Sequence, residues 1–192
     1  MSRKVCTFVV ENMNHIAHYD SPLGDITLVS DGQALTGLWF LTSSVSDNKV
    51  FGSPSGCDGQ PHFGSTIGTQ ATLPAELPIF DEARRWLDIY FSGREPDFMP
   101  PLLLRGTSFQ QRVWEALLTI PYGQTVTYGE LAHQLGCRSA QAVGGAVGRN
   151  PIAIIVPCHR IVGTNGSLTG YAGGLDRKRA LLQLEQKIYF AF

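Results

Sequence analysis

The sequence predicts an α+β protein, in which a small domain of strands and one helix precedes a mainly helical domain with a helix-turn-helix. Three observations support this prediction. Short segments rich in β-forming residues come first, helical periodicity dominates the second half, and a proline-rich stretch separates the two. The chain has 192 residues, 43% of them apolar, which is enough for a sizeable core. We place the domains at residues 1–100 and 101–192.

The first domain begins with a predicted antiparallel meander. Its strands are expected at His15–Tyr19, Asp25–Ser30 and Ala34–Leu41, because the turn signals SPLG and DG lie between them. Ser, Gly, Asp, Asn, Thr and Gln dominate residues 43–72, which predicts a long mobile loop. Apolar residues then recur at helical spacing along Pro78–Ser92, and a glycine follows to end that helix.

The second domain is expected to be helical. Thr107 and Ser108 cap the run FQQRVWEALLTI. Thr127 is a predicted N-cap of a short helix, with Glu130 at the offset of a capping box. After a tight turn, a second short helix spans Ser139 to about Gly148, so the pair has a helix-turn-helix outline. A last helix, LDRKRALLQLEQ, begins with charges that are expected to form a solvated face, with one or two of them on DNA phosphates.

The second helix of this pair consists almost entirely of Ala, Gly and Val. Gly144 and Gly145 each cost a helix about 1 kcal/mol relative to Ala, so something is expected to approach closely. Two explanations of these glycines remain open, which are tight packing against another helix and insertion into a DNA groove. Charge favours DNA, since residues 105–192 carry nine Lys and Arg against four Asp and Glu, while residues 1–104 carry six against twelve.

A candidate nucleophile follows in the run IAIIVPCHRIVG, which reads as an apolar strand interrupted by Pro157. Cys158 is followed there by His159 and Arg160. A free thiol has a pKa of about 8.5 and needs a nearby cation or imidazole to supply thiolate at neutral pH. Because adjacent residues of a strand point to opposite faces, His159 would reach the thiol through a water or a turn in the chain.

The spacing of the cysteines and the length of the apolar runs indicate the compartment in which the protein is expected to work. The four cysteines are too widely spaced for a CxxC zinc site and too few for a disulfide scaffold, so reduced thiols are expected. No apolar run reaches the roughly 20 residues that a membrane-spanning helix needs, and no secretory signal is recognised. We expect a cytoplasmic protein, or a nuclear one in a eukaryote, with no membrane partner.

The second half of the chain resembles the O6-alkylguanine-DNA alkyltransferases. The segments YGQTVTYGELA, AVGGAVGRNP, PCHR and GSLTGYAGGLDRKRALLQLE stand in the order found in that family, and the similarity spans roughly Phe109 to Glu185. DSPLG and the meander are similar to the family's small ribonuclease-H-like domain. The resemblance implies a winged-helix-like second domain. It also implies a single-turnover, irreversible transfer of the alkyl group from O6-alkylguanine, and from O4-alkylthymine, in double-stranded DNA after base flipping.

The resemblance also implies residue roles. Cys158 would accept the alkyl group, His159 would deprotonate it through a bound water, and Glu185 would orient the imidazole. Tyr128 would stand at the backbone of the extruded nucleotide, and Asn150 would link the recognition helix to the strand bearing Cys158. The other expected site residues contact DNA (Arg138, Ala140, Gln141, Gly144, Arg149 and Arg160) or enclose the flipped base (Val156, Pro157, Gly170, Tyr171 and Ala172).

Two positions depart from the family pattern. Many relatives have an arginine directly before the AVGG segment to fill the gap left by the flipped base, whereas this chain has Gln141, for which Arg138 is a possible substitute. Some relatives bind zinc in the first domain, but Asp31 stands where the partner of Cys6 would be, so neither a metal nor another cofactor is expected.

Two other functions compete with alkyl transfer. One is a non-enzymatic protein that binds alkyl lesions or regulates transcription, against which the presence of Cys158 argues. The other is a cysteine hydrolase, which would regenerate its thiol, whereas an alkyl acceptor is consumed. We expect a monomer in solution that can assemble cooperatively on DNA.

Overall fold

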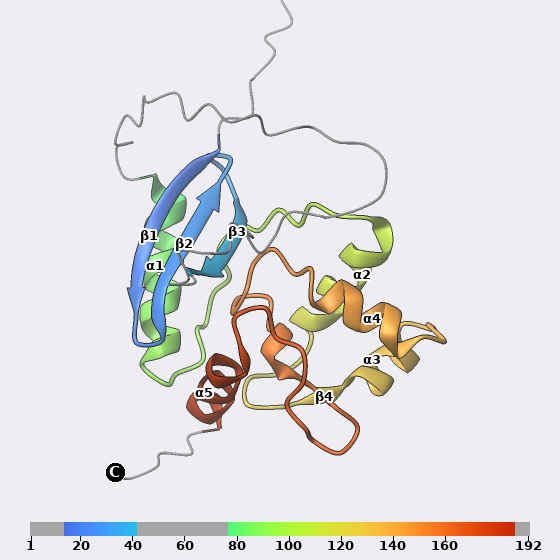
Figure 1. The fold of residues 1–192 in the computed structure, drawn as a ribbon. Coiled ribbons are helices and arrows are strands. Elements are labelled where there is room, and N and C mark those ends of the chain that lie inside the picture. Colours follow the sequence, from blue (N-terminus) through green and yellow to red (C-terminus); the bar gives the residue numbers. More distant parts are fainter. Residues whose placement is uncertain (1–13, 42–76, 187–192) are drawn as a thin grey trace, which may run out of the picture.

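The computed structural model describes residues 14–41 and 77–186. The loop predicted at 43–72 and the cysteines Cys6 and Cys57 lie outside the described residues. In the described part, a three-stranded sheet with one helix forms the N-terminal half (Figure 1). The helices α2 (Ser108–Leu118), α3 (Tyr128–Gln134) and α4 (Ala140–Val147) gather in the C-terminal half (Figure 1). The last helix, α5 (Leu175–Glu185), lies near the boundary between the two halves (Figure 1). The predicted α+β class is therefore confirmed.

The N-terminal half is an antiparallel meander, as predicted. Its strands are β1 (His15–Ser21), β2 (Gly24–Ser30) and β3 (Leu35–Phe40), in that spatial order. Gly24 begins β2 directly after a tight turn and has φ of +106°, a conformation that favours glycine. The helix α1 (Pro78–Phe91) packs against the sheet through the buried face that its spacing predicts. The N-terminal half shares one apolar core with the C-terminal half, because both contribute side chains to the same buried cluster.

Backbone hydrogen bonds join the two halves along β3. The amide of Leu38 donates to the carbonyl of Pro151 at 2.9 Å, and the amide of Ala153 donates back to Leu38 at 2.8 Å. Leu35 makes the same kind of two-way contact with Pro101 and Leu103, at 2.8 Å each. The edge of the sheet is therefore covered by segments of the second half, and the chain before Cys158 is anchored to the first half.

The helix-turn-helix forms as the sequence predicts. It consists of α3 (Tyr128–Gln134), which has the expected Thr127 capping box, and α4 (Ala140–Val147), whose N-cap is Ser139. The preceding helix, α2 (Ser108–Leu118), packs on α4, where the indole nitrogen of Trp114 donates to the carbonyl of Ala146 at 2.9 Å. Across the described ranges, the chain has no helix of the length and apolarity needed to cross a membrane.

The strand predicted through Cys158 is wrong. Cys158–Arg160 forms one turn of 3₁₀ helix, and only Ile161–Val162 (β5) is a strand, paired in parallel with β4 (Val126–Thr127). Ile154 has φ of +68°, which a β-branched residue rarely adopts, and Pro157 has no amide hydrogen for a ladder. The run is apolar because it crosses the centre of the core, where Ile154 and Val156 are fully buried.

Candidate active site

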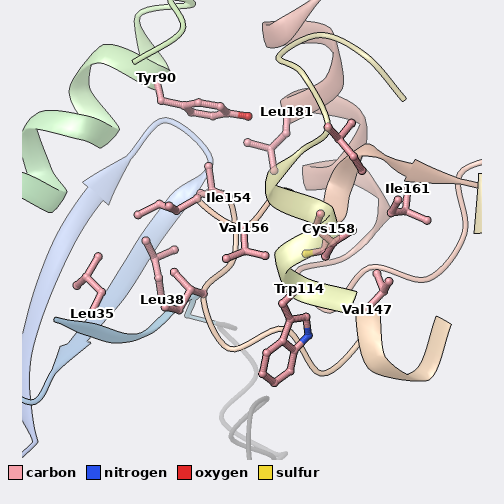
Figure 2. Close-up of a cluster of buried hydrophobic side chains, with 14 of the residues drawn as sticks. Leu35, Leu38, Tyr90, Trp114, Val147, Ile154, Val156, Cys158, Ile161 and Leu181 are labelled. Atoms are coloured by element: carbon pink, nitrogen blue, oxygen red, sulfur yellow. The ribbon is translucent and has the colours of Figure 1, made fainter. Parts of the chain in front are cut away.

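Cys158 lies inside the protein. Figure 2 shows it in the same cluster of buried side chains as Trp114, Val147 and Val156. Burial raises the pKa of the Cys158 thiol, although a hydrogen bond with the Asn150 side chain and the charge of Lys178 act in the opposite direction. The thiol is therefore protonated at neutral pH, and its reaction needs a base.

The candidate base is His159, the next residue in the sequence, and Glu185 contacts its imidazole. Nε2 of His159 lies 2.6 Å from Oε1 of Glu185, and neither side chain is exposed. Burial lowers the pKa of His159 even though the Glu185 carboxylate raises it, so the imidazole is neutral near pH 7. A neutral imidazole that donates from Nε2 keeps its lone pair on Nδ1, and Nδ1 is buried with no partner in residues 14–41 and 77–186.

Glu185 is a buried carboxylate with several donors. Nε of Arg160 lies 2.8 Å from Oε2, and the amide of Gly123 donates to the same oxygen at 3.0 Å. The hydroxyl of Tyr90 donates to Oε1 at 2.7 Å. Burial by itself would raise the pKa of Glu185, but the contacts with His159 and Arg160 outweigh it and lower the pKa to about 2. Glu185 is therefore ionised, and its charge is neutralised by Arg160.

This geometry corrects one predicted DNA contact. Arg160 was predicted to contact DNA, but its guanidinium points inward: Nη1 donates to the carbonyl of Ile120 at 2.6 Å, and Nε and Nη2 donate to Glu185. Tyr90 is a site residue that the sequence did not reveal. It is 95 positions from Glu185, and nothing in the pattern of its helix distinguishes it from other core aromatics.

Asn150 joins α4 to the turn that carries the thiol. Its Nδ2 donates to the carbonyl of Val156 at 2.8 Å, and its Oδ1 accepts from the amide of Ile152 at 3.0 Å. The structure brings Asn150 to the expected place, although the segment it holds is a turn and not a strand. The Asn150 side chain therefore holds the backbone that leads to Cys158 at two points, one before and one after Ile154.

The loop expected to enclose a base lies next to the thiol. Val156 and Pro157 are buried, whereas Gly170 and Ala172 are exposed at the rim. Tyr171, the residue between Gly170 and Ala172, is half-buried. Its hydroxyl is buried without a partner in the described part of the chain. Burial, and then the nearby Cys158, raise the pKa of Tyr171 well above its ordinary range.

Tyr128 connects this loop to the helix-turn-helix. Its hydroxyl lies 3.3 Å from the carbonyl oxygens of both Thr169 and Gly170. Gly170 has φ of +51°, and a Cβ there would come within 3.3 Å of that hydroxyl, so the close approach needs glycine. A Cβ on Gly144 would lie 3.6 Å from the Tyr128 ring, an ordinary van der Waals contact, so packing against Tyr128 does not by itself require glycine at this position. Tyr128 therefore lies between the loop and α4.

The start of α5 differs from the expected solvated face. Lys178 is fully buried and donates from Nζ to the carbonyl of Thr169 at 2.6 Å. Arg177 donates from Nε to the carbonyl of Leu23 at 2.9 Å, so it reaches the N-terminal half. Only Asp176 and Arg179 match the expectation, since they are exposed and form a 3.5 Å ion pair.

One side of α4 is open to solvent and consists largely of small residues. Gln141 and Ala142 in its first turns, Gly145, and Arg149 just beyond its end are exposed. Arg138 and Ala140 are exposed beside them. The row at positions 141, 145 and 149 repeats every four residues, so these residues share one face. A partner can approach the α4 backbone closely along this face.

A helix-turn-helix whose open side carries mostly small residues, together with a buried thiol followed by an imidazole that a carboxylate holds, is the combination expected of a DNA-binding protein with a cysteine nucleophile. Family models match both halves: residues 14–104 match the ribonuclease-like domain of 6-O-methylguanine DNA methyltransferase, and residues 108–187 match its DNA binding domain. The chain belongs to the methylated-DNA--protein-cysteine methyltransferase family.

Individual relatives agree with this assignment. A methylated-DNA--protein-cysteine methyltransferase of Mycobacterium tuberculosis is 46% identical over 175 residues, covering 91% of this chain and 93% of the relative. That of Haemophilus influenzae is 40% identical over 177 residues, covering 91% and 88%. The crystal structure of M. tuberculosis O6-methylguanine methyltransferase gives a TM-score of 0.71 at 43% identity, covering 94% of this chain and 97% of that one. The M. tuberculosis OGT structure in complex with DNA gives 0.70 at 46% identity, covering 92% and 96%.

Proposed function

We propose that the protein reverses alkylation damage in DNA by moving the alkyl group from O6 of guanine, and from O4 of thymine, onto the sulfur of Cys158. One observation carries this proposal: the buried thiol is followed by an imidazole that is fixed by Glu185 at Nε2 and has a buried, unpartnered Nδ1 among the described residues. A sulfur nucleophile with its own oriented base is what alkyl transfer requires.

The chemistry needs no metal or organic cofactor. Nδ1 of His159 takes the thiol proton through a water molecule, and the S–C bond forms as the O6–C bond breaks. The proton then passes to the departing guanine, so atoms and charge balance. The product is a thioether, which thiol exchange does not reverse, so each molecule reacts once.

Access to the alkyl group requires the base to leave the duplex. A buried sulfur cannot reach O6 inside stacked DNA, and extrusion costs a few kcal/mol, less for a poorly paired damaged base. We propose that Gln141, Ala140, Arg138 and Arg149 contact double-stranded DNA along the open side of α4, with Gly144 behind them. The extruded base enters between Tyr171 and the Val156–Pro157 wall, past Gly170 and Ala172, with Tyr128 at its backbone. We expect the chain to work in the cytoplasm, as a monomer that can assemble cooperatively on DNA.

Mass spectrometry tests this function directly. The protein is mixed with a duplex containing one O6-methylguanine, and the intact mass and the peptide containing Cys158 are measured. The expected result is one methyl group per molecule, located on Cys158, and none on the Cys158→Ala variant. The matched control is Cys137→Ala, which removes the half-buried thiol of the helix-turn-helix and should leave transfer unchanged.

The same experiment decides between the competing functions. A non-enzymatic lesion-binding protein would retain the duplex without gaining mass, and a hydrolase would act repeatedly without gaining mass. Methylation of the Cys158→Ala variant at another residue would overturn the assignment of the acceptor.

A further inference from the structure

A residue of the N-terminal half reaches into the active site. Tyr90 is near the end of α1 and is fully buried, and its hydroxyl oxygen lies 2.7 Å from Oε1 of Glu185 and 3.3 Å from Nε2 of His159. Figure 2 shows the Tyr90 ring extending from α1 toward the C-terminal half, where Leu181 of α5 lies. The other groups in this cluster, His159, Arg160 and Glu185, all belong to the C-terminal half.

We propose that Tyr90 is a positioning residue for activation of the Cys158 thiol, through which the ribonuclease-like half sets the orientation and proton affinity of His159. This inference rests on the proposed alkyl transfer. Tyr90 acts through Glu185 and His159.

Counting donors and acceptors gives the first step of the argument. The Tyr90 hydroxyl has one hydrogen, and the shorter contact, to the ionised Glu185 carboxylate, takes it. The lone pairs of the hydroxyl oxygen then face Nε2 of His159, which must itself donate to Glu185. A deprotonated Nε2 would face two acceptors and no donor. Tyr90 and Glu185 together therefore keep the proton on Nε2 and the lone pair on Nδ1.

The packing around Tyr90 makes this arrangement rigid. The Tyr90 ring stacks on Trp86 with a centroid distance of 5.3 Å and an interplanar angle of 10°. Tyr122 contacts it edge-on at 6.0 Å, and the His159 ring does the same at 6.4 Å. These ring contacts restrict the Tyr90 side chain, so its hydroxyl is held in place before the thiol reacts.

Charge balance supplies the second step. The groups around the imidazole are the Glu185 carboxylate, the Arg160 guanidinium, the Lys178 ammonium, the Tyr90 hydroxyl and the Cys158 thiol. Glu185 favours the imidazolium, whereas the two cations disfavour it. By donating to Glu185, Tyr90 takes up part of the negative charge that would otherwise hold a proton on His159. Tyr90 therefore helps to keep the base neutral.

Tyr90→Phe removes the hydroxyl and keeps the ring. The experiment measures the single-turnover rate of Cys158 alkylation by free O6-benzylguanine as a function of pH, a substrate that requires no DNA. We expect a rate about tenfold lower at neutral pH, the effect of losing one hydrogen bond to a charged group. We also expect the acidic limb of the profile to move to higher pH, because Glu185 then holds the imidazolium more tightly.

The matched control is Tyr19→Phe. Tyr19, on β1, also donates to a carboxylate, at 2.8 Å to Asp88 of α1, so its hydroxyl is bonded to a carboxylate other than Glu185. Its rate and profile should equal those of the wild type. A structural role for Tyr90 would lower the unfolding temperature without moving the acidic limb, so a Tyr90→Phe profile that matches that of Tyr19→Phe overturns the inference.

A measurement on the unmodified protein guards against a variant that does not fold. Nitrogen NMR of the His159 ring should place the proton of the neutral imidazole on Nε2, and a proton on Nδ1 would overturn the inference. Failure of the proposed function has a different signature, since the wild-type protein would then gain no alkyl group on Cys158 at any pH.

Discussion

Nε2 of His159 and Oε1 of Glu185 are 2.6 Å apart, in a place where neither side chain touches solvent. This contact occupies one imidazole nitrogen and leaves the other to act as the base. Arg160 balances the charge of the Glu185 carboxylate and donates two hydrogen bonds to it, one from Nε and one from Nη2. In the proposed function, three consecutive residues of the PCHR run therefore supply the nucleophile (Cys158), its base (His159) and the counterion of Glu185 (Arg160).

Replacing Glu185 by Gln should slow the alkylation of Cys158 by about 100-fold or more, because general-base catalysis contributes about that much and the orienting charge is lost. It should also lower the free energy of unfolding by about 3–5 kcal/mol, since Arg160 remains buried without its partner. Single-turnover alkylation and urea unfolding measure the two effects. The matched control is Glu115→Gln, the same change at an exposed position on α2, which should alter neither. Wild-type kinetics in the Glu185→Gln variant would remove this residue from the mechanism.

The pH dependence of the wild-type reaction follows from two opposite shifts. Burial lowers the pKa of His159 below its ordinary value of 6.5 and raises that of Cys158 above 9.0. Between these values the base is neutral and the thiol carries its proton, which is the reactive combination for transfer through His159. The alkylation rate by a free alkylated base should therefore change by less than about twofold from pH 6.5 to 9.0 and fall only at lower pH. A rate that rises tenfold per pH unit across this range would instead indicate direct ionisation of the thiol.

Local signals in the sequence predicted the elements that hold the site. The meander turns, the helical face of α1 and the Thr127–Glu130 capping box depend on residues close in sequence, and each appears where expected. The strand predicted before Cys158 failed for a tertiary reason. An apolar run crossing the core looks like a buried strand, and periodicity does not reveal the left-handed turn at Ile154.

Charged residues were the other source of error. The sequence predicts Arg160 and Lys178 as surface cations, because it does not show that Glu185 and the carbonyl of Thr169 are buried partners for them. Tyr90 was missed for the same reason, since its partner lies in the other half of the chain. Cys158 and His159 were identified from the PCHR run itself, and Glu185, Tyr128 and Asn150 from the family resemblance. Contacts between the two halves could not be predicted from sequence patterns.

Arg177 should stabilise the contact between the two halves. Its guanidinium donates to the carbonyl of Leu23 and lies 4.7 Å from the centre of the Phe40 ring. Arg177→Ala removes both interactions and should lower the unfolding temperature by about 4 °C, the effect of roughly 1–2 kcal/mol in a domain of this size. Differential scanning calorimetry measures it. Arg179→Ala, two positions along the same helix, removes an exposed ion pair and should cause no shift. Equal shifts in the two variants would contradict a role for Arg177 in joining the halves.

Gln141 lies in the first turn of α4 and is exposed. If this side chain fills the gap left by the flipped base, arginine should hold the extruded state more firmly, because it adds a phosphate-attracted charge and a planar group that stacks.

Gln141→Arg should therefore speed the repair of O6-methylguanine in duplex DNA by about tenfold, the effect of one charge-assisted contact. The reaction with free O6-benzylguanine should stay unchanged, since a free base needs no extrusion. The matched control is Gln134→Arg, which adds the same charge at an exposed site on α3 and should strengthen duplex binding without changing the rate at saturating DNA. Single-turnover rates on duplex and free base separate these effects. If Gln141→Arg accelerates both reactions equally, or leaves duplex repair unchanged, Gln141 is not the residue that enters the stack, and Arg138 becomes the next position to test.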